Sequence, residues 1–256
     1  MQTFFNAMPF LYFMISRTQG LNHRISVIIP TYNEEENIGN TLRELRKLLP
    51  TAEFIVADGR STDNTVKIAK KLADRVVFEK LKPGQRGSIA GGRNAGARAS
   101  KNHYLLFCDA DNVPPKGFYS RMIEEFENPD VVGFGGKVIP KNATFIQRLV
   151  FEFFNVIVGL SVLFKKPSIA GNAAGYKKKP FFAVGGFDTS MQASEDQDLC
   201  QRISKKGRVV YDSRIVTFTS NRRLAKFGLG GLLWDWGIIT LNFIVGKKTE
   251  HYELAR

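Results

Sequence analysis

The chain has 256 residues, with 37 Lys or Arg against 24 Asp or Glu, so its formal net charge at pH 7 is +13. A hydrophobic fraction of 43% is ample for a core, and the length fits one large domain or one domain with an extension. Two cysteines exclude a disulfide-framed secreted domain and favour a reducing, intracellular setting. The positive charge indicates an anionic partner, and the 21 phenylalanines favour a membrane surface over nucleic acid.

Strand and helix signals alternate through the first half of the chain. Apolar, often β-branched runs predict strands at 25–29, 54–57, 75–78 and 104–108. Between them we expect helices at 37–48, at 63–72 and, in an Ala- and Gly-rich segment that suits close packing, at 89–100. This alternation predicts an α/β fold with a mostly parallel sheet and helices on both faces. In such sheets, ligands bind beyond the carboxyl ends of the strands.

The second half has a different character. It predicts a glycine-bearing strand at 131–138, a long Phe-rich helix at 144–164 and a loop with two glycines at 167–176. A charged amphipathic helix follows at 195–206, and a last strand signal lies at 215–218. The tail is basic and then apolar, which adds C-terminal apolar or amphipathic helices to the expected fold.

Three apolar stretches bear on membrane association. No secretory signal is recognisable, and the stretch at 4–15 is too short to span a bilayer. The stretches at 149–164 and 227–246 are of borderline length and carry polar residues, so we expect buried or interfacial helices there. Lysine clusters adjoin apolar stretches, a pattern that suits an anionic membrane surface at ~1 kcal/mol per lysine. Solvated charge runs are the alternative for these clusters, which lie at 165–166, 177–179 and 247–248.

Two aspartates one residue apart, Asp109 and Asp111, follow the apolar run at 104–108. On an extended backbone, residues i and i+2 point to the same side, so both carboxylates can face one hard cation that holds a diphosphate. A solvated turn is the alternative. Polar clusters also follow the first two predicted strands, at 30–33 and 58–59, so three such clusters are expected on one edge of the sheet.

Five ordered motifs of the chain resemble those of family 2 glycosyltransferases with the GT-A fold. They are VIIPTYNEE at 27–35, ADGRSTD at 57–63, GRNAG at 92–96, DAD at 109–111, and GGFD at 185–188 followed by SEDQDL at 194–199. The resemblance runs from Ile25 to about Gly207, roughly two-thirds of the chain. It implies an inverting transfer from a nucleotide-activated sugar by a single displacement, and it leaves the identity of the sugar open.

The resemblance implies a donor site and a metal site. The expected nucleotide-sugar residues are Pro30, Thr31, Tyr32, Asn33, Glu34, Asp58, Arg86, Arg93, Asp109 and Ala110. Asp109 and Asp111 are implied to bind Mg²⁺ or Mn²⁺, which would neutralise the charge on the departing diphosphate. The family often has a second aspartate where Gly59 stands, so Asp58 is expected to contact the base or ribose by itself. A local turn is the alternative for Asp58, and a solvated surface loop is the alternative for the segment around Arg86.

On the acceptor side, Glu195 and Asp196 begin a predicted helix, where carboxylates are favoured in any case. The family match makes Asp196 the expected general base and Glu195 the second candidate. Because a polyprenyl phosphate needs little help from a base, this pair favours a hydroxyl acceptor on a glycan or lipid-linked sugar. A polyprenyl-phosphate acceptor remains open. Further acceptor or phosphate candidates are Gly171, Asn172, Asp188, Arg222 and Arg223.

These expectations divide the chain into three parts. An apolar extension at 1–24 and a basic, then apolar segment at 221–256 are candidates for membrane association. Between them, a catalytic domain at 25–220 has a nucleotide-binding half at 25–112 and an acceptor-binding half at 113–220. The expected location is the cytoplasmic face of a membrane, with peripheral or shallow insertion and no specific nucleic-acid partner.

Two other classes of function are less consistent with the sequence. Nucleotidyltransferases present a glycine-rich phosphate loop after the first strand, whereas 30–34 has no glycine. A basic nucleic-acid-binding protein should interleave aromatic residues on exposed strands, whereas the aromatic residues lie in long apolar runs such as 151–154.

Overall fold

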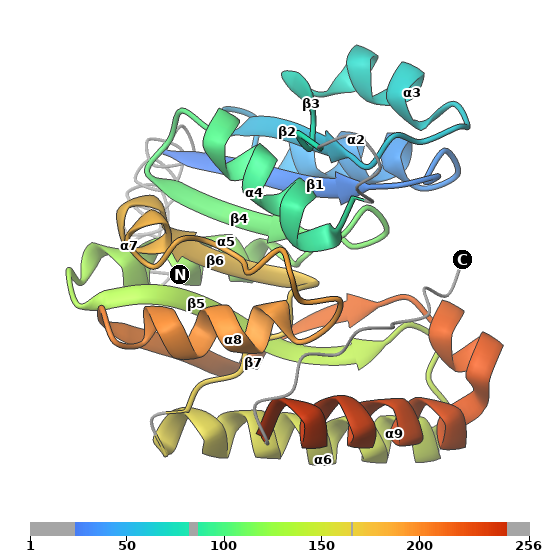
Figure 1. Ribbon diagram of the computed structural model, residues 1–256, viewed down its shortest axis with the longest axis vertical. Helices are drawn as coiled ribbons and strands as arrows, with labels where there is room; N and C mark the ends of the chain where they lie inside the picture. The colour runs from blue at the N-terminus through green and yellow to red at the C-terminus, as the bar shows by residue number, and fades with distance from the viewer. Residues whose placement is uncertain (1–23, 82–86, 165, 245–256) are drawn as a thin grey trace, which may run out of the picture.

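The computed structural model describes residues 24–81, 87–164 and 166–244, which form one seven-stranded sheet surrounded by helices (Figure 1). The strand order is β3-β2-β1-β4-β6-β5-β7. Four of the six pairings are parallel and the two made by β6 are antiparallel, which confirms the mostly parallel sheet. The strands are β1 (Ile25–Thr31), β2 (Glu53–Asp58), β3 (Arg75–Phe78), β4 (Tyr104–Cys108), β5 (Val131–Pro140), β6 (Ala173–Lys177) and β7 (Arg208–Thr219).

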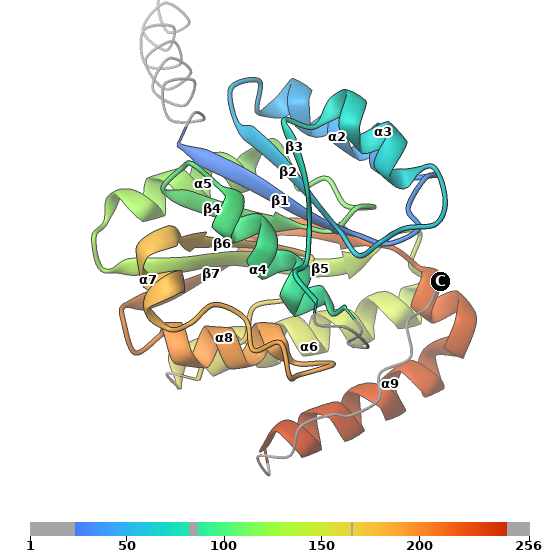
Figure 2. The same ribbon diagram turned by 45° about the horizontal axis from the view of Figure 1, so that its top comes forward.

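The helices cover both faces of the sheet, as the sequence predicts (Figures 1 and 2). They are α2 (Ile38–Leu48), α3 (Thr65–Leu72), α4 (Ile89–Ala99), α5 (Lys116–Glu127), α6 (Phe145–Leu163), α7 (Lys178–Ala183), α8 (Glu195–Ile203) and α9 (Arg222–Ile244). One buried cluster joins the sheet to α2, α3 and α5, and a second joins it to α4, α7 and α8. A third, smaller cluster joins α6 and α9 to the ends of β5 and β7.

The inner strand β1, between β2 and β4, shows why the sequence folds this way. Residues 25–29 are fully buried, as expected for a parallel strand that is covered on both faces. On one face, α4 lies so close that a Cβ atom at Gly96 would stand 2.4 Å from Cγ2 of Ile28. Only glycine permits this approach, so the Ala- and Gly-rich composition of α4 reflects close packing, as expected.

Two elements differ from the sequence-based expectation. The segment 167–176, expected to be a loop, contributes the start of β6, and 116–127 forms α5, which no pattern predicted. The sequence AAGYK of β6 lacks the β-branched residues that mark a strand. It is extended because β4 and β5 pair with it on both sides, which is a tertiary effect.

Helix α6 is mostly exposed, so of the two alternatives expected for this segment, a buried or an interfacial helix, the buried one is wrong. Phe151 and Asn155 are the buried residues of its 19. Large apolar side chains face outward, namely Phe145, Ile146, Leu149, Phe153, Val156, Ile157, Leu160 and Leu163. Within the described residues, α6 is the one helix long and apolar enough to cross a membrane, with a mean hydropathy of 1.6, which by itself is weak evidence of a span.

Two polar contacts hold α6 lengthwise against β5. The side-chain amide of Asn155 donates to the carbonyl oxygen of Val138 (2.8 Å) and accepts from its N–H (3.0 Å). One turn earlier, Lys137 Nζ donates to Glu152 Oε2 at 2.6 Å. The Asn155 bonds satisfy backbone groups of the strand and the Lys137–Glu152 pair links the side chains, so α6 is an integral part of the domain.

Helix α9 runs beside α6 at the end of the molecule opposite α2 and α3 (Figure 1). Trp236 of α9 stacks edge-on against Phe151 and Phe154 of α6, with ring centroids 5.2 and 4.9 Å apart. The helix is interrupted at Gly228, where φ is 66°. The first turn of α9 therefore has a different direction from the part that packs on α6 (Figure 2).

Candidate active site

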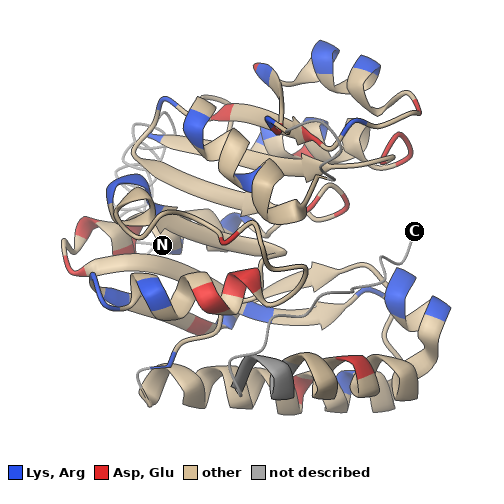
Figure 3. Ribbon diagram, viewed as in Figure 1, with Lys and Arg blue, Asp and Glu red and all other residues tan. Residues whose placement is uncertain are grey.

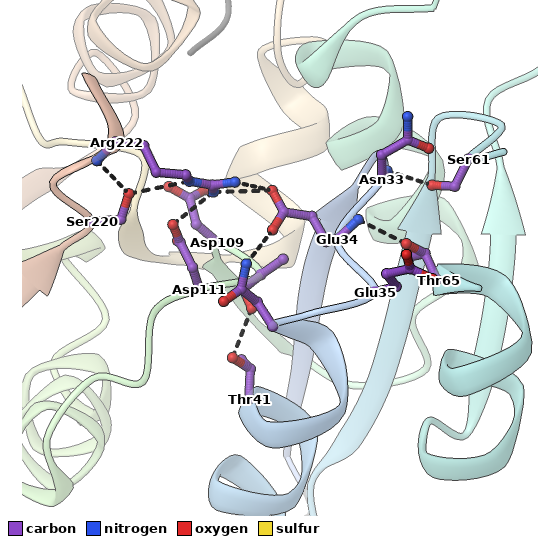
Figure 4. A network of polar contacts seen from close by, with 12 residues as sticks. Asn33, Glu34, Glu35, Thr41, Ser61, Thr65, Asp109, Asp111, Ser220 and Arg222 are labelled. Atoms are coloured by element: carbon purple, nitrogen blue, oxygen red, sulfur yellow. Dashed lines mark hydrogen bonds and ion pairs between the residues drawn. The ribbon is translucent and has the colours of Figure 1, made fainter. Parts of the chain in front are cut away.

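The loops after β1 and β2 are joined at the carboxyl edge of the sheet. The N–H of Asn33 donates to Ser61 Oγ (2.8 Å), and the N–H of Thr62 donates to Asn33 Oδ1 (2.9 Å). One residue further, the N–H of Glu34 donates to Thr65 Oγ1 at 2.7 Å (Figure 4). These bonds support left-handed backbone at Asn33, with φ of 53°. The two polar clusters predicted at neighbouring strand ends are thus brought together.

Asp58 is fully buried beneath these loops. Its carboxylate accepts from Thr31 Oγ1 (3.0 Å), from the N–H of Ser61 (2.8 Å) and from Ser61 Oγ (2.6 Å). Asp58 therefore stabilises its own turn, which is the alternative to a base or ribose contact that the sequence analysis gave for this residue. Tyr32, by contrast, is exposed beside it, while Pro30 is half-buried. A contact between Asp58 and a base or ribose stays a prediction.

The pair Asp109 and Asp111 lies in a turn that begins where β4 ends at Cys108. The N–H of Asn112 donates to the carbonyl oxygen of Asp109 at 3.1 Å. The assumption of an extended backbone through this pair is therefore wrong. Thr41 Oγ1 donates to the carbonyl oxygen of Ala110 at 2.7 Å, which ties the turn to α2.

Each of the two aspartates faces a different arginine. Oδ1 of Asp109 is 3.3 Å from Nη2 of Arg93, and Oδ2 of Asp111 is 2.7 Å from Nη2 of Arg222. Arg222 also contacts Glu34 Oε1 at 3.0 Å. Figure 4 shows Asp109, Asp111, Glu34 and Arg222 converging at one place on the sheet edge.

Arg93, on α4, is buried at the centre of the site. Nη1 donates to Glu195 Oε1 at 2.8 Å, and Nη2 donates to Asp109 Oδ1 at 3.3 Å and to the carbonyl oxygen of Gly171 at 3.1 Å. Burial lowers the pKa of Arg93, but the charges of Glu195 and Asp109 outweigh that effect and raise it overall. The arginine therefore stays cationic between a carboxylate that follows β4 and a carboxylate that begins α8.

The two carboxylates that contact Arg93 have raised pKa values. Burial raises the pKa of Glu195 to about 7, with a further contribution from the charge of Asp196 and an opposing one from Arg93. Burial likewise raises the pKa of Asp109 to about 6 against the attraction of Arg93. Groups with such shifts are typical of functional sites, because burial there is combined with specific charge partners.

Asp196 and the segment 171–172 further connect the start of α8 to the turn after β4. Asp196 Oδ2 accepts from the N–H of Gly171 (2.9 Å), and Oδ1 accepts from the N–H of Gln197 (2.8 Å). The carbonyl oxygen of Asn172 accepts from the N–H of Asp109 at 3.2 Å. Gly171 and Asn172, predicted as acceptor-side candidates, therefore lie between Asp109 and Asp196.

Two sets of contacts at the site, made by Asn94 and by Lys141, were not predicted from the sequence. The side-chain amide of Asn94 donates to the carbonyl oxygen of Phe187 (2.8 Å) and accepts from its N–H (2.9 Å), which joins the motif at 92–96 to that at 185–188. Lys141 Nζ donates to the carbonyl oxygen of Asp111 at 2.7 Å. The GRNAG motif contained Asn94, but no sequence pattern identified its partner.

The remaining candidates are placed differently. Asp188 accepts from the N–H and hydroxyl of Ser190 within its own loop. Arg223 pairs with Asp235 of α9 at 2.9 Å, so of the two neighbouring arginines it is Arg222 that reaches the carboxylates. Arg86 lies outside the described residues, as do Lys165 and the cluster at 247–248.

The described residues contain no group of three or more His, Cys, Asp or Glu already arranged around a metal position. The oxygen-only side chains of Asp109, Asp111 and Glu34 nevertheless suit a hard divalent cation in ligand type. The charge that such a cation would neutralise is balanced here by Arg222, whose guanidinium bridges Asp111 and Glu34. The carboxylate oxygens at this edge of the sheet are therefore ligands of the type that Mg²⁺ or Mn²⁺ prefers.

Residues 26–185 match the family model described as glycosyl transferase family 2. Among curated proteins, the chain is 26% identical over 221 residues to the dolichyl N-acetyl-alpha-D-glucosaminyl phosphate 3-beta-D-2,3-diacetamido-2,3-dideoxy-beta-D-glucuronosyltransferase of Methanococcus voltae, covering 80% of this chain and 62% of the relative. It is 28% identical over 204 residues to the succinoglycan biosynthesis protein ExoA of Rhizobium meliloti, covering 71% and 58%. The chain thus spans about three-fifths of the length of these relatives.

Solved structures share the fold. A mannosyltransferase from Pyrobaculum calidifontis, in complex with GDP-Man and Mn²⁺, superposes with a TM-score of 0.62 at 22% identity, covering 77% of this chain and 56% of that one. Residues 1–349 of TarS from S. aureus, in complex with UDP-GlcNAc, superpose with a TM-score of 0.58 at 18% identity, covering 77% and 58%. These likenesses confirm the expected GT-A fold.

Proposed function

Because the chain belongs to glycosyltransferase family 2, we propose that it transfers a sugar from a nucleoside-diphosphate sugar to a hydroxyl group, with inversion. One observation carries this proposal: Arg93 joins Asp109 of the donor side to Glu195 of the acceptor side. The proposed leaving-group site and the start of α8, where Asp196 follows Glu195 as the proposed base, therefore lie on either side of one buried cation. Direct displacement at a sugar carbon requires the base and the leaving-group site on opposite faces of that carbon, because the acceptor oxygen bonds to it as the diphosphate departs from the other side.

The donor side is built by the loops after β1, β2 and β4. The proposed contacts to the nucleotide come from Tyr32 and its neighbours at 30–34, from Asp58, and from Arg86, which precedes α4 in the sequence. Asp109 and Asp111 would hold Mg²⁺ or Mn²⁺, which when bound supplies positive charge to the departing diphosphate. The complexes of the Pyrobaculum mannosyltransferase with GDP-Man and Mn²⁺ and of TarS with UDP-GlcNAc support a donor of this class.

On the acceptor side, Asp196 is the proposed general base. Backbone N–H groups of Gly171 and Gln197 orient its carboxylate, and each oxygen retains a lone pair for an acceptor hydroxyl. Glu195 instead directs its carboxylate to Arg93. In this proposal, Asp196 removes the hydroxyl proton as the oxygen attacks the anomeric carbon, and Glu195 is a positioning residue that holds Arg93.

The proposed acceptor is a hydroxyl of a glycan or of a lipid-linked sugar. A base beside the site is useful for a hydroxyl, whereas a polyprenyl phosphate is already anionic. The name of the Methanococcus relative includes a dolichyl-linked sugar phosphate, which supports the lipid-linked form. Transfer to a polyprenyl phosphate is the second candidate, and it would not need Asp196 as a base.

We further propose that the exposed side of α6 binds an anionic membrane surface on its cytoplasmic face. Both α6 and α9 carry few charged residues (Figure 3), and the row of outward apolar side chains on α6 needs a non-aqueous partner. Because Asn155 and Glu152 tie α6 along β5, the helix can lie in the interface without spanning the bilayer while the domain stays intact. Peripheral or shallow attachment follows.

The test is a panel of nucleotide sugars with Mn²⁺ or Mg²⁺, scored for hydrolysis, transfer and thermal stabilisation of the purified protein. We expect a metal-dependent rise of the melting temperature with one nucleoside diphosphate and its sugar. If no nucleotide sugar or nucleoside diphosphate produced a metal-dependent shift, the proposed function would be wrong.

A further inference from the structure

The guanidinium of Arg222 lies across the carboxylates of Glu34 and Asp111 (Figure 4). Nη2 is 2.7 Å from Asp111 Oδ2, and both terminal nitrogens are 3.0 Å from Glu34 Oε1. Nε donates to Ser220 Oγ at 3.3 Å. Every nitrogen of this side chain therefore has a partner on the sheet edge, and two of those partners are negatively charged.

Arg222 is the outer member of this group. Its side chain is 40% exposed, whereas those of Glu34 and Asp111 are 12% and 13% exposed. The guanidinium therefore shields the two carboxylates from water. A cation that approaches Asp111 Oδ2 from solvent meets Arg222 first, and two cations cannot both stand at hydrogen-bonding distance from that one oxygen without strong repulsion.

We propose that Arg222 is an exchangeable counter-cation: Asp111 releases it when a divalent metal arrives with the donor, and the freed guanidinium binds the donor diphosphate. This inference rests on the proposed function, since it requires a diphosphate donor and a metal held by Asp111. The planar fork of an arginine matches two phosphate oxygens as well as it matches carboxylates, so one side chain can serve both states.

The backbone around Arg222 suits an exchange made by the side chain. Arg222 is the first residue of α9, shortly after β7 ends at Thr219, and its N–H donates to Ser220 Oγ at 3.3 Å. On the other side, Lys141 holds the carbonyl oxygen of Asp111 at 2.7 Å. Both main chains are thus anchored, while the long arginine side chain between them can turn from carboxylate to phosphate.

The exchange couples the binding of metal and nucleotide. Without nucleotide, a metal must displace Arg222 from Asp111 and leave the guanidinium with one carboxylate partner fewer. With nucleotide, the displaced arginine gains the diphosphate. Metal and nucleoside diphosphate therefore raise each other's affinity, and linkage requires the two factors to be equal.

Titration calorimetry with Mn²⁺ alone tests the first half of the proposal. We expect Arg222→Ala and Arg222→Gln to bind Mn²⁺ roughly tenfold more tightly than the unaltered protein, because a charge-assisted hydrogen bond no longer competes. Arg222→Lys retains the charge and should bind Mn²⁺ about as weakly as the unaltered protein. Arg223→Ala, which removes the neighbouring arginine that pairs with Asp235, is the matched control and should leave Mn²⁺ affinity unchanged.

Titration of the same proteins with GDP and UDP at saturating Mn²⁺ tests the second half. Arg222→Ala should weaken nucleotide binding roughly tenfold, so the substitution acts in opposite directions on the two ligands. Melting curves verify folding, and Arg222→Gln replaces the alanine variant if that one unfolds. Unchanged or weaker Mn²⁺ binding by both variants would overturn the inference.

The two proposals fail in distinguishable ways. If the unaltered protein shows Mn²⁺-dependent nucleotide binding but removal of Arg222 does not tighten Mn²⁺, the inference about Arg222 is wrong and the proposed function stands. If neither the unaltered protein nor the variants bind Mn²⁺ or nucleotide, both are wrong.

Discussion

Arg93 and Glu195 form an ion pair of 2.8 Å although 102 residues separate them in the chain. Both side chains are buried, at 5% and 13% exposure. The same guanidinium reaches Asp109 at 3.3 Å and the carbonyl oxygen of Gly171 at 3.1 Å. One side chain therefore ties α4, the turn after β4, the segment before β6 and the start of α8 into a single unit.

Removing the charge of Arg93 should destabilise the protein strongly. Arg93→Met keeps much of the side-chain volume but leaves Glu195 and Asp109 without their partner, at a cost of about 3–5 kcal/mol in the free energy of unfolding. Urea denaturation measures the loss. Arg98→Met, at an exposed position of the same helix, is the control and should change stability by less than about 0.5 kcal/mol. Equal effects of the two substitutions would show that the buried ion pairs contribute nothing.

Gly171→Ala should impair transfer by displacing Arg93. A Cβ atom at this position would stand 2.8 Å from Nη1 and 2.9 Å from Nη2 of Arg93, so the guanidinium must shift. We expect kcat to fall about 100-fold, because a displacement of about 1 Å in the supporting groups of an active site has an effect of that size. Gly230→Ala, where a Cβ atom meets nothing within 4 Å, should retain full activity. Activity of Gly171→Ala within twofold of the control would contradict the geometry.

The raised pKa of Glu195 predicts a pH dependence of stability. Its pKa is about 7 in the folded protein against an ordinary value of 4.5, so the folded state binds this proton more tightly than the unfolded state. The resulting stabilisation is complete below about pH 4.5 and is lost as the pH rises through 7. Asp109, with a pKa of about 6, contributes in the same direction over a lower range.

The measurement is urea denaturation between pH 4 and 8 in the presence of a chelator. The unaltered protein should still lose stability between pH 6 and 8, whereas Glu195→Gln should be nearly flat there because most of the contribution of Asp109 is lost below this range. Glu44→Gln, which removes a carboxylate paired with Lys47 on the surface, should retain the slope of the unaltered protein. A retained slope in Glu195→Gln would rule out Glu195 as its source.

Asp109→Asn and Asp196→Asn should separate binding from chemistry. Asp109→Asn removes a proposed metal ligand, so the Mn²⁺-dependent rise in melting temperature with nucleoside diphosphate should disappear. Asp196→Asn should retain that rise and lose transfer by 100-fold or more, the usual contribution of a general base. Each variant is the control for the other. If Asp196→Asn transferred at the normal rate, the acceptor would be an anionic phosphate or the base would be another residue.

The exposed side of α6 should bind lipid. Replacing Phe153 and Leu160, both exposed, with Gln should lower cosedimentation with phosphatidylglycerol-containing vesicles at least tenfold, since each buried apolar side chain contributes about 1.5–3 kcal/mol. The melting temperature should not fall, because neither side chain belongs to the core. Phe78→Gln, at an exposed position of β3, is the matched control. Vesicle binding that survives the double substitution would place the membrane contact elsewhere.

Local patterns in the sequence were sufficient for much of the fold. The buried strand at 25–29 follows from a short β-branched run and the helix at 38–48 from apolar residues at helical spacing, since both patterns are local properties of the sequence. The common strand edge also allowed the loops after β1, β2 and β4 to be grouped, because parallel strands end on the same side. The antiparallel strand β6 could not be predicted, since its extended form depends on pairing with β4 and β5.

The sequence by itself determined which residue types stand at the strand ends, and through its ordered motifs it determined the family and the GT-A fold. The tertiary structure decided how those residues combine. It placed Arg93 between Asp109 and Glu195, put Arg222 on Asp111, buried Asp58 under its own loop and left α6 exposed. The physical reason is that charge pairing and burial depend on groups brought together from distant parts of the chain, whereas strand and helix patterns depend on neighbours within a few residues.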